Sequence, residues 1–321
     1  MRAIVHDQYG SFDVLGLRDI DLPVVKDDEV LVRVRAAGLH VGDCFGVRGA
    51  PFAMRLVTGL LKPKHGVPGF DVAGQVEAVG TNVRQFRPGD EVFGACNGAC
   101  AEYACAGKDK LALKPVNLTF EQAAAVPTSA LAALHALRDV GKVQPGQKVL
   151  INGASGGVGT FAVQIAKSLG AEVTGVCSTT NADTVRSIGA DRVIDYTQED
   201  FTQGGKRYDL ILDNVENRSL SDCRRALAPS GTLILNSGTG AHGIGMLVRL
   251  VKPLALSPFV RQNLRRYLSV PNHRDLVILK QLVESGKLTP VIDRKYPLHE
   301  SAAALGYIAA GHARGKVVIT L

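Results

Sequence analysis

Paired cysteines and long apolar runs are both missing from this 321-residue chain. None of its six cysteines forms a C-x-x-C pair, which in a chain of this length indicates reduced thiols and a cytoplasmic location. No apolar run approaches the length of a membrane span, and no signal peptide precedes the first strand-like residues, 2–5. An organelle-targeting segment ahead of this sequence stays an alternative.

Clustered basic charge is also missing, although the chain is basic overall. Its formal net charge is +7 and its isoelectric point is about 9.1, yet no run of five or more lysines and arginines occurs. Dispersed cations are typical of a solvated surface, with a local contribution to binding an anionic cofactor. We therefore expect no nucleic-acid partner, since no motif for one is present.

Internal repeats and low-complexity tracts are absent too, and the remaining composition is that of a globular protein. Hydrophobic residues make up 46% and charged residues 21% of the chain, and glycine is frequent at 35 residues. The length predicts two domains, each large enough to bury a core.

A glycine-rich turn at residues 153–159 (G-A-S-G-G-V-G) organises the second of these domains. It follows a β-branched apolar run at 149–151 and precedes apolar residues at helical spacing. A second strand at 172–177 closes a βαβ unit. In this context glycine permits unusual dihedrals and a close approach to a pyrophosphate, which the helix N-terminus then attracts. The motif predicts a dinucleotide site, with Ala154, Gly156 and Gly159 at the fingerprint positions.

The first 122 residues are predicted to be mostly β. Residues 29–36 alternate apolar and polar side chains, and strands at 71–80 and 91–94 are separated by turns, as in a barrel-like β domain. The pattern changes near Thr119, where a helix start is followed by an Ala/Leu-rich stretch interrupted at Pro127.

Alternating strands and helices follow the glycine turn and predict a doubly wound parallel sheet. The predicted strands are 193–196, 208–213 and 231–235; the predicted helices lie near 182–188 and 220–227. The basic and apolar segment 240–270 is either a pair of amphipathic helices with its arginines in water, or a lid or subunit contact. A regular helix is expected at 273–285, and β-type sequence from 288 to 321.

Taken together, the chain resembles the medium-chain dehydrogenase/reductase superfamily, in its zinc-free quinone oxidoreductase-like branch. The likeness runs over nearly the whole chain. The motifs that carry it are A-A-G-L (36–39) with Asp43, P-G-F-D-V-A-G (68–74), P-G-D-E-V-F-G (88–94), A-E-Y (101–103), A-V-P-T (125–128), the glycine turn, L-H-E (298–300) and G-K-V-V (315–318).

The resemblance implies an α/β protein with two domains and a homodimeric assembly. A GroES-like β-barrel catalytic domain would comprise residues 1–122 and 266–321, and a Rossmann domain residues 123–265. The active site would lie in the cleft between them, at the carboxyl ends of parallel strands.

The resemblance also implies that no zinc is bound. Zinc-dependent relatives carry a cysteine and a histidine ligand at positions that here hold His40 and Phe70. Phenylalanine cannot coordinate a metal, and one imidazole does not make a three-ligand site. The four closely spaced cysteines of a structural zinc lobe are missing as well, so Cys96, Cys100 and Cys105 are interpreted as packing residues.

Without a metal, the implied chemistry is hydride transfer from NADPH to a quinone or an α,β-unsaturated carbonyl, an acceptor that delocalises the incoming charge. His40 would bind or protonate the substrate oxygen, with Asp43 orienting it; alternatively His40 is a neutral part of the cleft wall and Asp43 caps a turn. Thr128 would contact the nicotinamide carboxamide; its alternative role is to interrupt a helix.

The remaining cofactor positions are assigned by the same resemblance. The pyrophosphate would meet Ala154, Ser155, Gly156, Gly157 and Val158; the nicotinamide would lie beside Val215, Ser237 and Gly238; a 2′-phosphate would meet Ser178, Thr179, Thr180 and Tyr196. NADPH is preferred over NADH because no acid follows the second Rossmann strand before Asp183. The basic residue usual near Thr180 is missing, and Arg186 or Arg314 would have to supply its charge.

Two other functions fit the same residues. One is an enoyl or alkenal double-bond reductase, since acceptor choice depends on pocket shape. The other is an NADPH-binding protein with little turnover, serving a structural, regulatory or nucleic-acid-associated role.

Overall fold

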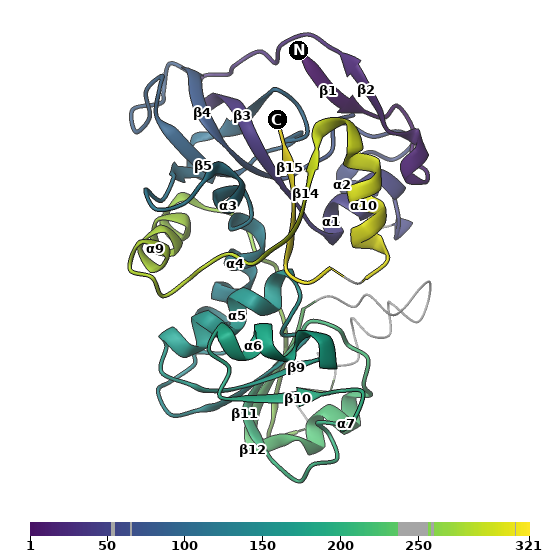
Figure 1. The fold of residues 1–321 in the computed structure, drawn as a ribbon, viewed down its shortest axis with the longest axis vertical. Coiled ribbons are helices and arrows are strands. Elements are labelled where there is room, and N and C mark those ends of the chain that lie inside the picture. The colour runs from purple at the N-terminus through teal and green to yellow at the C-terminus, as the bar shows by residue number, and fades with distance from the viewer. Residues whose placement is uncertain (53–54, 65, 237–255, 258–259, 312) are drawn as a thin grey trace. The chain divides into compact units, whose positions relative to one another are not determined.

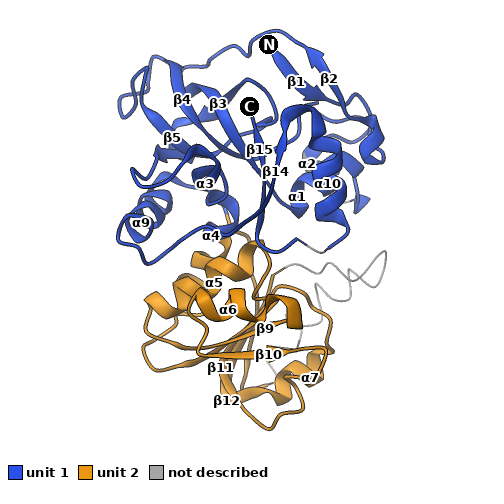
Figure 2. Cartoon of the chain, viewed as in Figure 1, with its two compact units in different colours: residues 1–131, 270–321 blue, residues 132–269 orange. Residues whose placement is uncertain are grey.

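The computed structural model describes residues 1–52, 55–64, 66–236, 256–257, 260–311 and 313–321. The chain divides into two compact units, which are coloured separately in Figure 2. Unit 1 comprises residues 1–131 and 270–321, and unit 2 comprises residues 132–269. The chain passes from unit 1 to unit 2 inside helix α4 (Pro127–Leu134), whereas the sequence analysis drew this boundary after residue 122.

Unit 1 is built on a sheet whose longest strand, β3 (Glu29–Leu39), pairs with three neighbours (Figure 1). The strand order is β14-β15-β3-β4-β5-β7, with β6 also paired to β3. The other strands of this sheet are β4 (Asp71–Val79), β5 (Glu91–Ala95), β6 (Tyr103–Gly107), β7 (Leu111–Leu113), β14 (Ile292–Pro297) and β15 (Lys316–Thr320). A separate antiparallel pair is formed by β1 (Arg2–Val5) and β2 (Gly16–Asp19).

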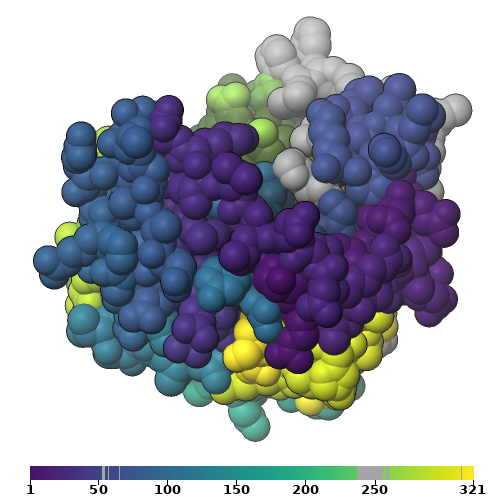
Figure 3. Space-filling view, turned by 90° about the horizontal axis from the view of Figure 1, so that it is seen from above, coloured from purple at the N-terminus to yellow at the C-terminus, as the bar shows by residue number. Residues whose placement is uncertain are grey.

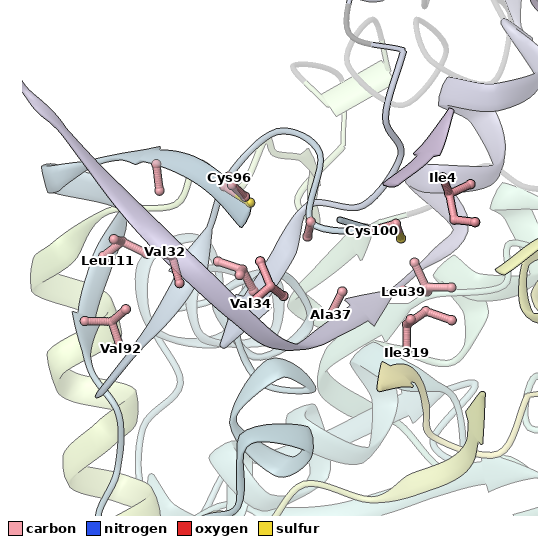
Figure 4. Packing of buried hydrophobic residues seen from close by; sticks show 14 of the residues in the cluster. Ile4, Val32, Val34, Ala37, Leu39, Val92, Cys96, Cys100, Leu111 and Ile319 are labelled. Atoms are coloured by element: carbon pink, nitrogen blue, oxygen red, sulfur yellow. The ribbon is translucent and has the colours of Figure 1, made fainter. Parts of the chain in front are cut away.

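The core of unit 1 follows from the alternation along these strands. In β3, Val32 and Val34 are buried while Arg33 and Arg35 are exposed, as the period-two pattern predicts. Figure 4 shows these valines among side chains from other strands, including Val92 and Ile319. Cysteines 96 and 100 belong to the same buried cluster, which agrees with their interpretation as packing residues.

The helices of unit 1 include the predicted start at Thr119. Its side chain accepts a hydrogen bond from the Gln122 amide, and its own amide donates to the Gln122 side-chain oxygen, so the two residues form a capping box. The helices are α1 (Val41–Arg48), α2 (Arg55–Thr58), α3 (Phe120–Ala124), α4, α9 (His273–Glu284) and α10 (Ser301–Ala309).

Unit 2 contains a six-stranded sheet in which every pairing is parallel. Its order is β10-β9-β8-β11-β12-β13, which is the doubly wound order 3-2-1-4-5-6 of a Rossmann domain. The strands are β8 (Lys148–Asn152), β9 (Glu172–Cys177), β10 (Arg192–Asp195), β11 (Tyr208–Asp213), β12 (Leu227–Leu235) and β13 (Asn263–Arg266). Helical segments are a π-helical turn (His135–Val140), α5 (Gly157–Ser168), α6 (Ala182–Ser187) and α7 (Leu220–Arg225). The predicted parallel sheet is confirmed.

The sequence prediction for the C-terminal tail is wrong. The tail is not uniformly β, because α10 lies between its strands; the run Ser-Ala-Ala-Ala-Leu consists of small residues and good helix formers, and it buries Ala304 and Leu305.

The segment 240–270, expected to be either a helix pair or a lid or subunit contact, lies outside the described residues at 240–255 and 258–259. Near its end, β13 extends the parallel sheet. Arg266 in this strand is not in water, because it forms a bidentate ion pair with buried Glu216.

Segments from the two ends of the chain lie together in unit 1. Helix α10 packs against the 3-10 turn Phe12–Val14, and Figure 3 shows N-terminal and C-terminal residues side by side on one face. Among the described residues, no helix has both the length and the apolar character to cross a membrane.

Candidate active site

The glycine turn of unit 2 forms a backbone cradle between β8 and α5. Gly153 has a φ of +78°, and Gly156 caps the N-terminus of the 12-residue helix α5. A Cβ atom on Gly159 would lie 2.0 Å from the Gly153 carbonyl oxygen, so only glycine lets the helix start this close to the turn. The first amides of the helix have no acceptor within it and point out of the turn. This arrangement fits a pyrophosphate.

Asn181, which the sequence analysis did not select, connects the end of β9 to this cradle. The Asn181 side-chain amide contacts the Ser155 hydroxyl at 3.2 Å and the Ser178 hydroxyl at 3.0 Å. Ser178 in turn lies 3.2 Å from the Thr180 hydroxyl. The structure therefore brings the predicted residues of the turn and of the strand end together.

Tyr196 also lies at this edge, as its amide donates to the Cys177 carbonyl at 3.0 Å and its side chain is exposed. The neighbouring Asp195 was missed because it comes from β10. Its carboxylate accepts from the Thr179 hydroxyl and from Thr197, and these hydrogen bonds lower the pKa of Asp195. An acidic residue is thus present beside the end of β9, but both of its carboxylate oxygens already accept hydrogen bonds from Thr179 or Thr197.

The two cations suggested for a 2′-phosphate differ in position. Arg186 forms an exposed ion pair with Asp183 at 2.8 Å, three residues earlier on α6. Such surface pairs contribute little and exchange readily, so the guanidinium stays available to an anion. Arg314 belongs to unit 1, where its amide donates to Asp293.

A buried polar network marks the point where the strand order of unit 2 reverses, between β8 and β11. Asp213 is fully buried and accepts hydrogen bonds from the Asn152 side chain at 2.8 Å and from the amides of Val215 and Glu216. Burial raises the pKa of Asp213. The network fixes the loop that carries Val215, whose methyl group packs where a Cβ atom of Gly153 would stand. Ligands bind at such reversal points in open α/β sheets.

Ser237 and Gly238, the other two residues predicted beside the nicotinamide, lie outside the described residues.

In unit 1, His40 and Asp43 meet at the start of α1. The Asp43 carboxylate accepts the His40 amide at 2.7 Å, and His40 Nδ1 accepts the Gly42 amide at 2.9 Å. Because Nδ1 is an acceptor, the neutral imidazole carries its proton on Nε2. This Nε2 atom is buried and has no hydrogen-bond partner among the described residues. His40 is therefore held as a free N–H donor.

An aromatic ring lies against this imidazole. Phe70 stacks on the imidazole with the ring centroids 5.6 Å apart, which shows that the two positions at issue for zinc are neighbours. Asp43 and Phe70 line a cavity of about 190 Å³ in unit 1, together with Val47, Val67 and Asn97. The second Asp43 oxygen, Oδ1, is buried without a partner among the described residues, and burial raises the pKa of this carboxyl.

Thr128 lies in the first turn of α4, where its amide and its hydroxyl both donate to Asp71. Asp71 follows Phe70 directly and begins β4. The structure thus ties Thr128 to the residue that directly follows Phe70, the neighbour of His40, a connection that the sequence analysis did not make.

Within the described part of the chain, no group of three or more histidine, cysteine, aspartate or glutamate side chains could hold a metal ion. Burial raises the pKa of the Cys44 thiol to about 12 and that of the Cys105 thiol to about 11.

Comparisons with known proteins agree with this architecture. Residues 26–136 match the family model of the alcohol dehydrogenase GroES-like domain, and residues 188–319 match that of the zinc-binding dehydrogenase domain. The first match confirms the expected GroES-like domain.

Similar proteins are found over the full length of the chain. The chain is 33% identical to a chloroplastic NADPH-dependent alkenal/one oxidoreductase of Arabidopsis thaliana, over 99% of this chain and 79% of that protein. It is also 33% identical to a chloroplastic quinone-oxidoreductase homolog of Spinacia oleracea, over 99% and 98%. The solved quinone oxidoreductase from Coxiella burnetii superposes with a TM-score of 0.87 at 32% identity, over 100% of this chain and 99% of that one. The chain belongs to the medium-chain dehydrogenase/reductase superfamily, in its quinone oxidoreductase-like branch.

Proposed function

We propose that this protein is a zinc-independent reductase that transfers hydride from NADPH to a quinone or an α,β-unsaturated carbonyl. The observation that carries the proposal is the buried Nε2 of His40, which has no partner among the described residues and whose ring stacks on Phe70, a residue that lines a cavity of unit 1. Relatives named for quinones and for alkenals and enones support the same substrate class.

The proposed cofactor residues form three groups, according to the part of NADPH that each would contact. Ala154, Ser155, Gly156, Gly157 and Val158 would hold the pyrophosphate; Ser178, Thr179, Thr180 and Tyr196 the 2′-phosphate; Thr128, Val215, Ser237 and Gly238 the nicotinamide. The glycine cradle, which a Cβ atom at Gly159 would fill, supports the first group. When bound, the reduced nicotinamide supplies the hydride.

His40 would stabilise the negative charge that develops on the substrate oxygen. Its Nε2–H donates, while the Gly42 amide on Nδ1 keeps the ring in this tautomer. Asp43 fixes the backbone of His40 and so the direction of the imidazole. A donor of this kind, preorganised in a site without water, contributes on the order of a hundredfold to a thousandfold in rate.

Zinc independence rests on Phe70. Its phenyl ring occupies the ligand position beside His40 and offers no electron pair to a metal. Conjugated acceptors do not need a Lewis acid, since they spread the incoming charge themselves.

The cytoplasmic location and the homodimer also stay predictions. The cysteines among the described residues are all free, in keeping with a reducing compartment. The relatives named above are chloroplastic, so a compartment cannot be transferred from them.

The test is steady-state oxidation of NADPH in the presence of 9,10-phenanthrenequinone or of an alkenal. Acceptor-dependent oxidation of NADPH, faster than that of NADH, supports the proposal, and the ratio between the two acceptors separates a quinone reductase from a double-bond reductase. Tight NADPH binding without oxidation by either acceptor contradicts the enzyme and favours the low-turnover binding protein.

A further inference from the structure

A buried ion pair lies in unit 1 behind Thr128. Lys316, at the start of β15, is 2% exposed and places Nζ 3.3 Å from Oδ2 of the fully buried Asp71. Its ammonium also donates to the Ser129 hydroxyl at 3.1 Å. Taking two charges out of water is costly, and apolar residues of the same volume often stabilise a fold as well. Stability alone therefore gives no reason for charges here.

The other carboxylate oxygen shows what the pair does. Asp71 Oδ1 accepts both the Thr128 amide, at 2.9 Å, and the Thr128 hydroxyl. A threonine hydroxyl has one hydrogen to donate, and this one is directed at Asp71. The Thr128 oxygen is left with lone pairs only, so toward any ligand it is an acceptor.

The rest of the cluster is rigid and inaccessible. Asp71, Ser129 and Lys316 are buried, and only Thr128 is partly exposed. Asp71 lies opposite Gly38 on β3, where a Cβ atom would stand 2.1 Å from the Ala124 carbonyl oxygen. Strands and helices therefore approach each other closely at this point, and the hydroxyl is held in one orientation.

We propose that Asp71 and Lys316 are positioning residues that make the Thr128 hydroxyl an obligatory acceptor for the carboxamide NH₂ of the reduced nicotinamide. The proposal rests on the proposed function, in which Thr128 contacts this group. It predicts selectivity for a cofactor with a donor at that position over an analogue that has a methyl group there.

The probe is the pair of NADPH and reduced 3-acetylpyridine adenine dinucleotide phosphate, in which a methyl ketone replaces the carboxamide. Dissociation constants are measured by isothermal titration calorimetry without an acceptor, so that turnover is not the readout. We expect the wild type to prefer NADPH by about tenfold, which corresponds to about 1.4 kcal/mol for one hydrogen bond.

The variants separate the roles. T128S keeps the hydroxyl and should keep the preference, whereas T128V should abolish it. D71L removes the oxygen that accepts the Thr128 hydroxyl, which frees this hydroxyl to donate to a ligand, and should bring the ratio near one. S129A is the matched control, since Ser129 contacts Lys316 but not Thr128, and its ratio should equal that of the wild type. If D71L does not fold, because it leaves the buried Lys316 without its partner, D71L/K316M, which removes both buried charges, takes its place.

A wild-type preference that survives in D71L or in D71L/K316M overturns the proposal. So does equal binding of both cofactors by the wild type, and in that case NADPH turnover with a quinone still stands as a separate test of the function. Binding of neither cofactor contradicts the function itself.

Discussion

His40 is the residue on which the chemistry depends, and it combines two tasks. It caps α1 by accepting the Gly42 amide and leaves Nε2–H as a donor. Two substitutions of His40 by side chains of nearly equal shape, asparagine and aspartate, separate helix capping from hydrogen-bond donation. Both residues cap helices well, but only asparagine keeps an N–H. H40N should keep kcat/KM within about tenfold, and H40D should lower it by about a hundredfold or more.

The measurement is NADPH oxidation with a quinone, with the dissociation constant of NADPH as the control for an intact cofactor site. Equal kcat/KM in H40N and H40D would show that the donor has no role.

Asp43 gives a prediction with a pH dependence. Burial raises the pKa of this carboxyl, so the folded state takes up its proton more readily than the unfolded chain. The contribution of Asp43 to stability is then fully present below its ordinary pKa and is lost as the pH rises through the raised value. D43N removes the buried charge and keeps an acceptor for the His40 amide.

D43N should therefore be more stable than the wild type at about pH 7.5, and the difference should shrink toward about pH 4. Urea unfolding at both pH values measures it. A variant that is less stable than the wild type at the higher pH contradicts the argument.

At the scale of elements, the turn between β8 and α5 offers a contrast between two glycines. G159A would place a Cβ atom 2.0 Å from the Gly153 carbonyl and must displace the turn, so we expect a loss of about 1–3 kcal/mol in unfolding free energy together with the loss of NADPH binding. In G156A the nearest atom is 3.4 Å away, an ordinary contact. G156A should fold as the wild type does and weaken NADPH binding only.

Thermal unfolding and NADPH titration of the two variants test this. Wild-type stability in G159A would mean that the turn does not require glycine there.

The residue patterns of the individual elements explain which of them could be predicted from the sequence. Strands β9 and β11 occur where the sequence placed them, because each is a short apolar run between turns. Helix α10 was missed, since a run of alanines lacks the apolar–polar alternation that identifies a helix face. Strand β13 was missed because Asn263-Leu-Arg-Arg is too polar for a buried parallel strand. It lies at the sheet edge, where Arg265 is exposed to water and Arg266 pairs with Glu216.

The candidate site was predictable only in part, for a spatial reason. Residues inside one motif, such as Ala154 and Gly156, were found from spacing. Asp195 and Asp213 come from other strands than the turn they support, and no spacing connects them to it. Asp71 sits inside a motif that the sequence analysis quoted, yet its partner Lys316 is 245 residues away.

At the scale of the whole molecule, we propose an NADPH-dependent reductase in which His40, and not a metal, stabilises the substrate oxygen. The measurement that tests this most directly is acceptor-dependent NADPH oxidation by protein freed of metal with a chelator, with zinc quantified in the same sample. The account predicts turnover of a quinone or an alkenal that is unchanged by the chelator, at well below one zinc per chain. Turnover that disappears with the chelator and returns with zinc would contradict it.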